Sequence, residues 1–281
     1  MTLTTGAAAL LDNFSLEMTA RDAPELPGAA KVLPAHTRVN VTFLATESLA
    51  ERVAGAKAVL AAGLTPVPHI AARRLTSTDE LRQVLGALRD ANASGSVFVV
   101  GGDPATPEGP FASARDVIET GLLPEFGVTH VSISGYPEGH PDIPDDVLWR
   151  ELEAKSAALA EQGIESTIIT QFGFDEAPIL EWLRELRARG ISAPVRLGLP
   201  GPAGVKRLLG FARRFGISSS AGIVKKYGFS LANLVGTAGP ERLIDQLADG
   251  LDPTVHGDVA VHFYTFGGVE ATSQWVHNYL A

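Results

Sequence analysis

Three ionisable side chains follow short apolar runs in positions suited to acid–base chemistry. Glu17, His69 and Asp103 each lie near or just beyond the end of a run rich in β-branched or other apolar residues. If the run 14–18 is a strand, Ser15 and Glu17 share one face of it. A carboxylic acid that faces an apolar interior has a raised pKa, which suits a general acid. We therefore predict a proton-transferring role for Glu17.

Further polar residues lie near or just after the ends of other apolar runs. They are Thr42, Tyr136, Glu138, His140, Gln171, Tyr264 and Thr265. In a barrel of parallel strands, all carboxyl ends meet at one mouth, where the active sites of such barrels lie. Seven runs would then send polar groups to the same place, which predicts an enzyme site.

Each of the three ionisable residues also has a purely structural interpretation. Glu17 can be read as a solvated edge carboxylate, Asp103 before a proline as a turn residue, and His69 as a hydrogen-bonded structural histidine. No pair among Glu17, His69, Asp103 and His140 has the i, i+4 or facial-triad spacing of a metal site, so none is predicted. No G-x-S-x-G motif and no cysteine is present, which excludes the usual serine and thiol nucleophiles.

The runs and the stretches between them predict the fold, a single α/β barrel of the (β/α)8 TIM type. The strands are expected at Phe14–Met18, Arg38–Leu44, Pro66–Ala71, Ser96–Gly101, Thr129–Ser134, Ser166–Gln171, Val195–Leu199 and Val259–Thr265. The helices are expected at Leu49–Ala62, Thr78–Asn92, Pro110–Thr120, Asp145–Gln162, Glu176–Arg189, Ala203–Phe215, Thr237–Asp249 and Val269–Tyr279. The first crossover is the weakest, because Arg21–Leu33 contains two prolines.

Composition narrows the class of protein further. The 281 residues are 45% hydrophobic and 20% charged, with a net charge of -9, which disfavours nucleic-acid binding. No membrane span, signal peptide, phosphate-binding loop or dinucleotide fingerprint is found. We expect one domain over residues 1–281, with the long connection 216–237 capping the barrel, in a cytoplasmic monomer or small homo-oligomer.

Taken in order, several stretches resemble the methylenetetrahydrofolate reductase family. They are Phe14-Ser-Leu-Glu17, Val39-Asn-Val-Thr42, Pro68-His69, Gly102-Asp103-Pro104, Tyr136-Pro-Glu-Gly-His140-Pro141, Ile169-Thr-Gln171-Phe-Gly-Phe174-Asp175 and His262-Phe-Tyr264-Thr265. The similarity runs from residue 14 to about residue 275 and implies reduction of 5,10-methylenetetrahydrofolate to 5-methyltetrahydrofolate in one-carbon metabolism.

The resemblance also implies roles for residues of this chain. The catalytic residues would be Glu17, as the acid that protonates N10, and Asp103, which stabilises developing positive charge. The folate would contact Thr42, Gln171, Phe174 and Tyr264. The redox cofactor would contact His69, Gly102, Tyr136 and His140.

Two departures from the family pattern concern the redox cofactor. Most of the family carries FAD, and the two cationic positions that meet its diphosphate correspond here to Gly101 and Leu159. We therefore expect NADH, or NADPH, to reduce the folate directly without bound flavin. An FAD-dependent reductase remains the alternative, together with a nonenzymatic folate- or pterin-binding barrel and a barrel enzyme acting on another reduced pterin.

Overall fold

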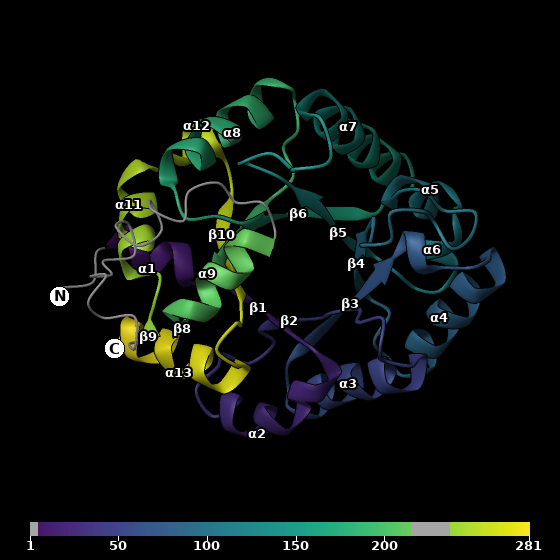
Figure 1. The fold of residues 1–281 in the computed structure, drawn as a ribbon, viewed down its shortest axis with the longest axis horizontal. Coiled ribbons are helices and arrows are strands. Elements are labelled where there is room, and N and C mark those ends of the chain that lie inside the picture. Colours follow the sequence, from purple (N-terminus) through teal and green to yellow (C-terminus); the bar gives the residue numbers. More distant parts are fainter. Residues whose placement is uncertain (1–4, 215–236) are drawn as a thin grey trace.

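The computed structural model describes residues 5–214 and 237–281, in which eight parallel strands close into a barrel (Figure 1). Around the barrel their order is β1, β10, β7, β6, β5, β4, β3 and β2. Their bounds are β1 Ser15–Met18, β2 Arg38–Val41, β3 Thr65–Ala71, β4 Ser96–Val100, β5 His130–Gly135, β6 Glu165–Phe172, β7 Val195–Pro200 and β10 Val259–Tyr264. The eight predicted strands and the predicted barrel are confirmed.

Alternation along each strand separates two apolar layers. On β4, Val97 and Val99 belong to the large cluster between strands and helices, whereas Phe98 and Val100 belong to a small cluster inside the barrel. Successive side chains of a strand point to opposite faces, so an uninterrupted apolar run satisfies both layers at once. Burial on both faces explains why these strands lack the polar alternation of an exposed sheet.

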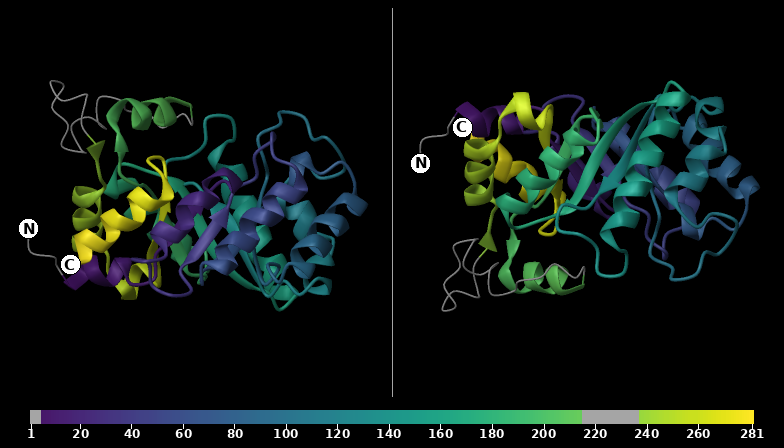
Figure 2. Two further views of the ribbon diagram at one scale, coloured as in Figure 1. Left: turned by 90° about the horizontal axis from the view of Figure 1, so that it is seen from below. Right: turned by 90° about the horizontal axis from the view of Figure 1, so that it is seen from above.

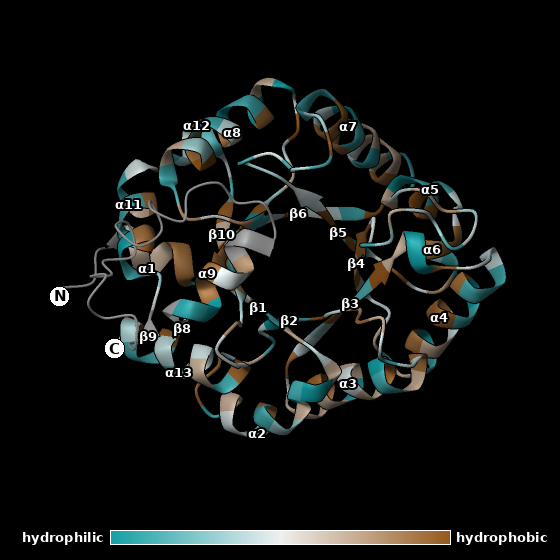
Figure 3. Cartoon of the chain, viewed as in Figure 1, coloured by the Kyte–Doolittle hydropathy of each residue, from teal (hydrophilic) through white to brown (hydrophobic). Residues whose placement is uncertain are grey.

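Helices surround the barrel and turn their polar faces outward (Figure 3). They are α3 Leu49–Ala61, α4 Thr78–Asp90, α5 Ala114–Glu119, α6 Leu122–Glu125, α7 Asp145–Glu161, α8 Glu176–Ala188, α11 Glu241–Gly250, α12 Pro253–His256 and α13 Val269–Leu280. Ser77 and Ser113 cap α4 and α5 by accepting backbone N–H groups of Glu80 and Asp116. These caps set where the two helices begin, so α5 begins at Ala114 and not, as predicted, at Pro110.

The structure also differs from the sequence expectation elsewhere. Residues 5–11 form a helix, α1 (Thr5–Leu11), which contacts α11 and β10. The proline-containing first crossover forms the 3-10 helix η1 (Ala20–Glu25) and the short α2 (Leu26–Ala29). The helix predicted from Thr237 was wrong at its start, because β9 (Thr237–Ala238) pairs with β8 (Ala203–Gly204) and Pro240 precedes α11.

One helix, α9 (Val205–Arg214), lies over one end of the barrel rather than around it, as the side views in Figure 2 show. This is the end at which the strands finish. The predicted capping segment 216–237 lies, except for Thr237, outside the described residues. Within the described ranges, no helix combines the length and apolar character needed to cross a bilayer.

Candidate functional site

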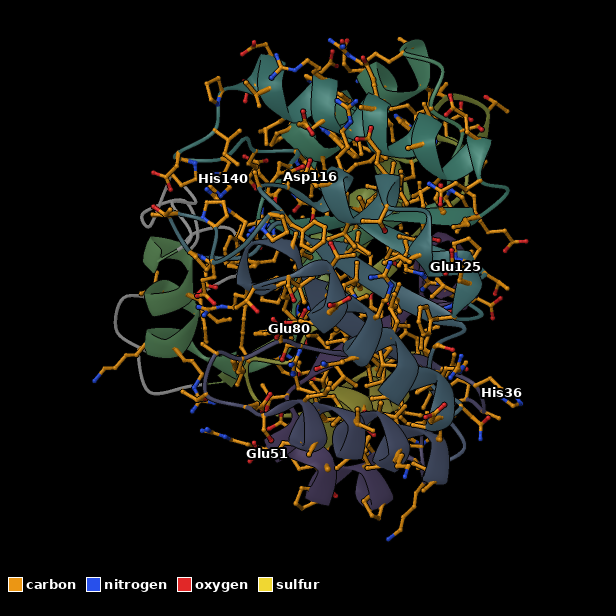
Figure 4. All side chains as sticks on the ribbon, turned by 90° about the vertical axis from the view of Figure 1, so that its right-hand side faces the viewer. His36, Glu51, Glu80, Asp116, Glu125 and His140 are labelled. Carbon is orange, nitrogen blue, oxygen red and sulfur yellow. The ribbon has the colours of Figure 1, made fainter. Side chains whose placement is uncertain are left out.

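A cavity of about 750 Å³ opens at the carboxyl ends of the strands. Nine of the ten predicted site residues line it: Glu17, Thr42, His69, Gly102, Asp103, Tyr136, His140, Gln171 and Tyr264. Its size suits a small-molecule site. Figure 4 shows His140 at the same end of the molecule as α9, whereas His36, which precedes β2, lies at the other end. The topology thus brings together side chains that lie far apart in the chain.

Two imidazoles face the carboxylate of Glu17 at the base of this cavity. Glu17 Oε2 lies 3.7 Å from Nε2 of His262 and 3.9 Å from Nε2 of His69. His262 is completely buried, and its Nδ1 lies 2.8 Å from the hydroxyl oxygen of Ser15. Glu17 keeps 20% of its side-chain surface exposed to the cavity. The carboxyl group can therefore reach a bound substrate while both imidazoles flank it.

Burial controls the protonation of these two histidines. It lowers the pKa of His69 to about 4, although the nearby Glu17 acts in the opposite direction. Burial likewise lowers the pKa of His262. Both rings are neutral near pH 7, so each imidazole presents one N–H donor and one acceptor nitrogen. Neither ring therefore places a full positive charge beside the Glu17 carboxyl group.

The lowered pKa of His69 predicts that acid destabilises the fold. The unfolded chain, with an ordinary histidine pKa near 6.5, binds a proton that the folded chain does not bind until about pH 4. Stability should therefore fall as pH decreases from 6.5 to 4, by roughly 3 kcal/mol from this residue. Urea unfolding of wild type and His69→Gln across this range measures the difference. An equally steep loss in both proteins would contradict the assignment to His69.

Asp103 lines the rim of the cavity and is held by an arginine behind it. Arg74 donates from Nε and Nη2 to the two carboxylate oxygens of Asp103, each at 2.8 Å, and Nη1 lies 3.3 Å from Glu108. Arg74 belongs to the 3-10 helix η2 (Ala72–Arg74), directly after β3. Although Asp103 is 73% exposed, the two parallel contacts fix its carboxylate in one orientation.

Removing the Arg74 fork should weaken any role that Asp103 has toward a substrate. Arg74→Ala is expected to lower kcat/KM by about tenfold, and Arg74→Lys to recover part of it, since lysine keeps the charge without the paired geometry. Asp103 is exposed and water screens the ion pair, so loss of the pair itself should change the melting temperature little. Steady-state kinetics with thermal melts of both variants check this. Unchanged kcat/KM in Arg74→Ala would show that the pair is only a surface contact.

Two hydroxyl groups at the mouth of the barrel donate hydrogen bonds to backbone carbonyl oxygens. Thr42 donates to the carbonyl oxygen of Met18, and Tyr264 donates to that of Thr170 at 3.1 Å. Burial raises the pKa of Tyr264 well above its usual range. The side-chain oxygen Oε1 of Gln171 accepts the N–H of Phe172 at 3.0 Å. These residues thus present oxygen lone pairs, an amide and a neutral phenol ring to the cavity.

The tenth predicted site residue, Phe174, is not among the residues that line the cavity. It is 4% exposed and packs edge-on against Phe172, with ring centroids 5.9 Å apart. The aromatic side chains of its cluster that do line the cavity are Phe172, Tyr264, Phe266 and Phe211. Phe211, on α9, stacks on Phe266 at 4.1 Å. The predicted substrate contact of Phe174 therefore stays a prediction, and the geometry favours Phe172 for direct contact.

The sequence assigns no role to three residues in or beside the cavity, of which His262 is buried next to Glu17. His262 lies two residues before Tyr264 and so points to the same face of β10. The alternation of side chains along a strand could therefore have predicted its position from the sequence. Phe211 and Arg207 line the cavity from α9, and Arg207 donates to the carbonyl of Phe266 at 2.7 Å. Their place depends on how α9 folds over the mouth, which no local pattern indicates.

A second cavity, of about 470 Å³, adjoins the first. Both cavities are lined by Ser134, Tyr136, His140, Gln171 and Phe172. The second one lies between the loops after β5 and β6 and the helices α7 and α8. Neither cavity is lined by a lysine among the described residues, and Arg207 is the one arginine there. Within the described ranges, no group of three His, Asp or Glu residues is placed to hold a metal ion.

Comparison with known proteins gives one family match. The sequence model of the family described as methylenetetrahydrofolate reductase matches residues 26–279. Methylenetetrahydrofolate reductase 2 of Saccharomyces cerevisiae is 29% identical over 172 residues, covering 58% of this chain and 27% of the yeast protein. Methylenetetrahydrofolate reductase (NADH) 1 of Zea mays is 29% identical over 140 residues, covering 45% of this chain and 23% of that protein.

The matched segments thus span about a quarter of the length of these two curated relatives. Among solved structures, dihydropteroate synthase from Thermus thermophilus superposes with a TM-score of 0.50 at 13% identity. The alignment covers 95% of this chain and 92% of that one. At this identity the likeness supports the barrel fold alone.

Proposed function

The chain belongs to the methylenetetrahydrofolate reductase family, and from that membership we propose that it reduces 5,10-methylenetetrahydrofolate to 5-methyltetrahydrofolate with a nicotinamide dinucleotide as direct hydride donor. The observation that carries this proposal is the convergence of Glu17, His69 and Gln171 in one cavity, with the buried His262 lying behind the Glu17 carboxylate. A carboxyl group flanked by neutral imidazoles is suited to deliver a proton at the base of a pterin-sized hollow.

The substrate must open its five-membered ring before it can accept hydride. Glu17 donates a proton to N10 as the bond from the methylene carbon to N10 breaks, which leaves an N5 iminium cation. Asp103, at the rim, stabilises that positive charge. Hydride from the dihydronicotinamide then adds to the methylene carbon and forms the methyl group. His262, between Glu17 and Ser15, orients the Glu17 carboxyl group for the next proton.

The described residues of this chain do not fit the diphosphate of a resident flavin. Gly101 lines the first cavity without a side chain, and Leu159 is fully buried in the core rather than facing either cavity. The second cavity is lined by Glu138 and Asp145 and by no lysine or arginine among the described residues. Each charge-assisted contact to phosphate contributes about 1.5–3 kcal/mol, so two absent cations weaken binding by two or more orders of magnitude.

A nicotinamide co-substrate needs less affinity than a resident flavin does. NADH binds and leaves in every turnover, so micromolar to millimolar affinity suffices, whereas a flavin must stay bound through purification and many turnovers. The few cations that the described residues bring to the two cavities are therefore compatible with a dinucleotide whose diphosphate remains in contact with solvent. This difference is the reason that we favour direct transfer over the FAD-dependent alternative.

Isotope transfer tests the proposal. Purified protein is mixed with 5,10-methylenetetrahydrofolate and NADH that carries deuterium at both C4 positions, without added flavin, and the product is analysed by mass spectrometry. We expect full retention of deuterium in the methyl group, because direct transfer never passes through an exchangeable N–H. Washout of deuterium, or visible flavin absorption in stoichiometric amount, would favour the FAD-dependent alternative. Folate binding without turnover would favour a nonenzymatic binder.

A further inference from the structure

The second cavity has a lining unlike that of the first. Its floor is apolar and consists of Leu148 and Leu152 of α7 with Ile179 and Trp182 of α8. Two exposed carboxylates, Glu138 and Asp145, stand among its lining residues, and no lysine or arginine of the described chain does. This lining suits a flat heterocycle joined to a group with hydroxyls: the ring would pack on the apolar side chains, and the hydroxyls would donate to the carboxylates. The lining does not suit an anion.

The two carboxylates are placed by different elements. Glu138 lies in the loop after β5, and its Oε1 accepts the N–H of Phe174 at 3.2 Å, which ties that loop to the one after β6. Asp145 is the first residue of α7. A helix N-terminus attracts anions, but here Asp145 and Asp146 already place negative charge in the first turn of α7. A phosphate group would meet repulsion where an uncharged hydroxyl would find acceptors.

We propose that this second cavity takes the adenosine end of NADH, with Glu138 and Asp145 accepting hydrogen bonds from ribose hydroxyls, and that it thereby selects NADH against NADPH. The inference rests on the proposed function, in which a nicotinamide dinucleotide is the hydride donor. In Rossmann-type dinucleotide-binding domains an acidic side chain binds the ribose 2′-hydroxyl of NAD, whereas an arginine accommodates the 2′-phosphate of NADP, and the same chemistry applies to the ribose in any fold. This cavity offers only the first of these arrangements among the described residues.

The geometry of the two cavities fits a dinucleotide. They share five lining residues and therefore adjoin, and in the proposed pose the dinucleotide extends from one to the other along the wall formed by Tyr136 and His140. Those two rings contact edge to face at 5.5 Å, and both side chains are partly exposed. The nicotinamide end would lie in the first cavity near Glu17, and the diphosphate would cross the partly exposed wall between the cavities.

Fragments of the cofactor separate this inference from the proposed reaction. ADP-ribose and its 2′-phosphorylated form lack the nicotinamide, so their binding is independent of hydride transfer. Quenching of intrinsic fluorescence gives the dissociation constants, because Trp149 and Trp182 line the cavity. Wild type should bind ADP-ribose at least tenfold more tightly than the 2′-phosphorylated form.

A matched pair of charge changes then locates the selectivity. Asp145→Arg places a cation in the cavity, whereas Asp146→Arg makes the same change at the neighbouring exposed residue of α7, which does not line the cavity. We expect Asp145→Arg to bring the ratio of the two dissociation constants close to one by strengthening binding of the 2′-phosphorylated form. Asp146→Arg should leave the ratio within about twofold of wild type.

Three results would overturn the inference. They are failure of wild type to bind ADP-ribose, equal wild-type affinity for both fragments, and the same change of ratio in both variants. Thermal melts of both variants confirm that the fold is kept, as expected for exposed positions. If deuterium is washed out in the isotope experiment while the fragments show the expected selectivity, the adenosine site is supported and direct hydride transfer is refuted.

Discussion

Glu17→Gln should lower kcat by about 10²–10⁴-fold while the dissociation constant of the folate stays within about threefold of wild type. Glutamine has the shape of glutamic acid and keeps an acceptor oxygen, so the cavity around His69 and His262 should remain. It cannot donate a proton of comparable acidity, so ring opening loses its acid. Because the missing interaction belongs to the transition state, the loss should fall on kcat rather than on binding.

Single-turnover oxidation of NADH in the presence of 5,10-methylenetetrahydrofolate measures this effect, and Asp22→Asn provides the control. Asp22 lines the same cavity, but its Oδ2 accepts from the N–H and hydroxyl of Thr19, two contacts that the asparagine oxygen can keep. The control removes a negative charge from the cavity without removing the proposed acid, and it should retain activity within about threefold. Equal losses in the two variants would mean that charge, not proton donation, explains the effect.

Positions at strand ends could be predicted from the sequence for a physical reason. In a parallel barrel all strands finish at the same mouth, so the order of apolar runs alone predicts that Glu17, His69 and Gln171 meet. Strand periodicity then decides which of their neighbours also face the interior. The structure confirms this convergence, and the family match is consistent with the resemblance stated from the motifs.

Contacts between loops could not be predicted in the same way. The fork from Arg74 to Asp103 joins residues 29 positions apart, through the turn after β3 and the loop after β4. Phe174 follows the predicted strand by only three residues, yet the chain turns it behind Phe172. Such placements depend on backbone turns and on side-chain packing between loops. The hydrophobic periods of strands and of helices carry no signal for either of these.

The pairing of β6 with β7, where the register of the barrel shifts, depends on the absence of a side chain at Gly198. The register between β6 and β7 shifts between Ile169 and Phe172, and Gly198 of β7 is paired with Phe172. A Cβ atom on Gly198 would lie 2.4 Å from the carbonyl oxygen of Thr170 and 2.8 Å from the ring of Tyr264. Gly198→Ala should therefore lower the free energy of unfolding by roughly 3 kcal/mol, the upper end for overpacking a core.

Gly86→Ala is the matched control for this substitution, because Gly86 lies within α4 and its nearest contact for an added Cβ is at 3.7 Å. Alanine there should raise stability by about 0.5–1 kcal/mol, since glycine is the poorer helix residue.

The Thr170 carbonyl that Gly198→Ala would displace also accepts from Tyr264, next to Gln171. Gly198→Ala protein that still folds should therefore bind folate more weakly as well as being less stable. Urea unfolding and folate titration of both variants separate the two effects, and a Gly198→Ala protein as stable as wild type would mean that β6 and β7 can shift apart without cost.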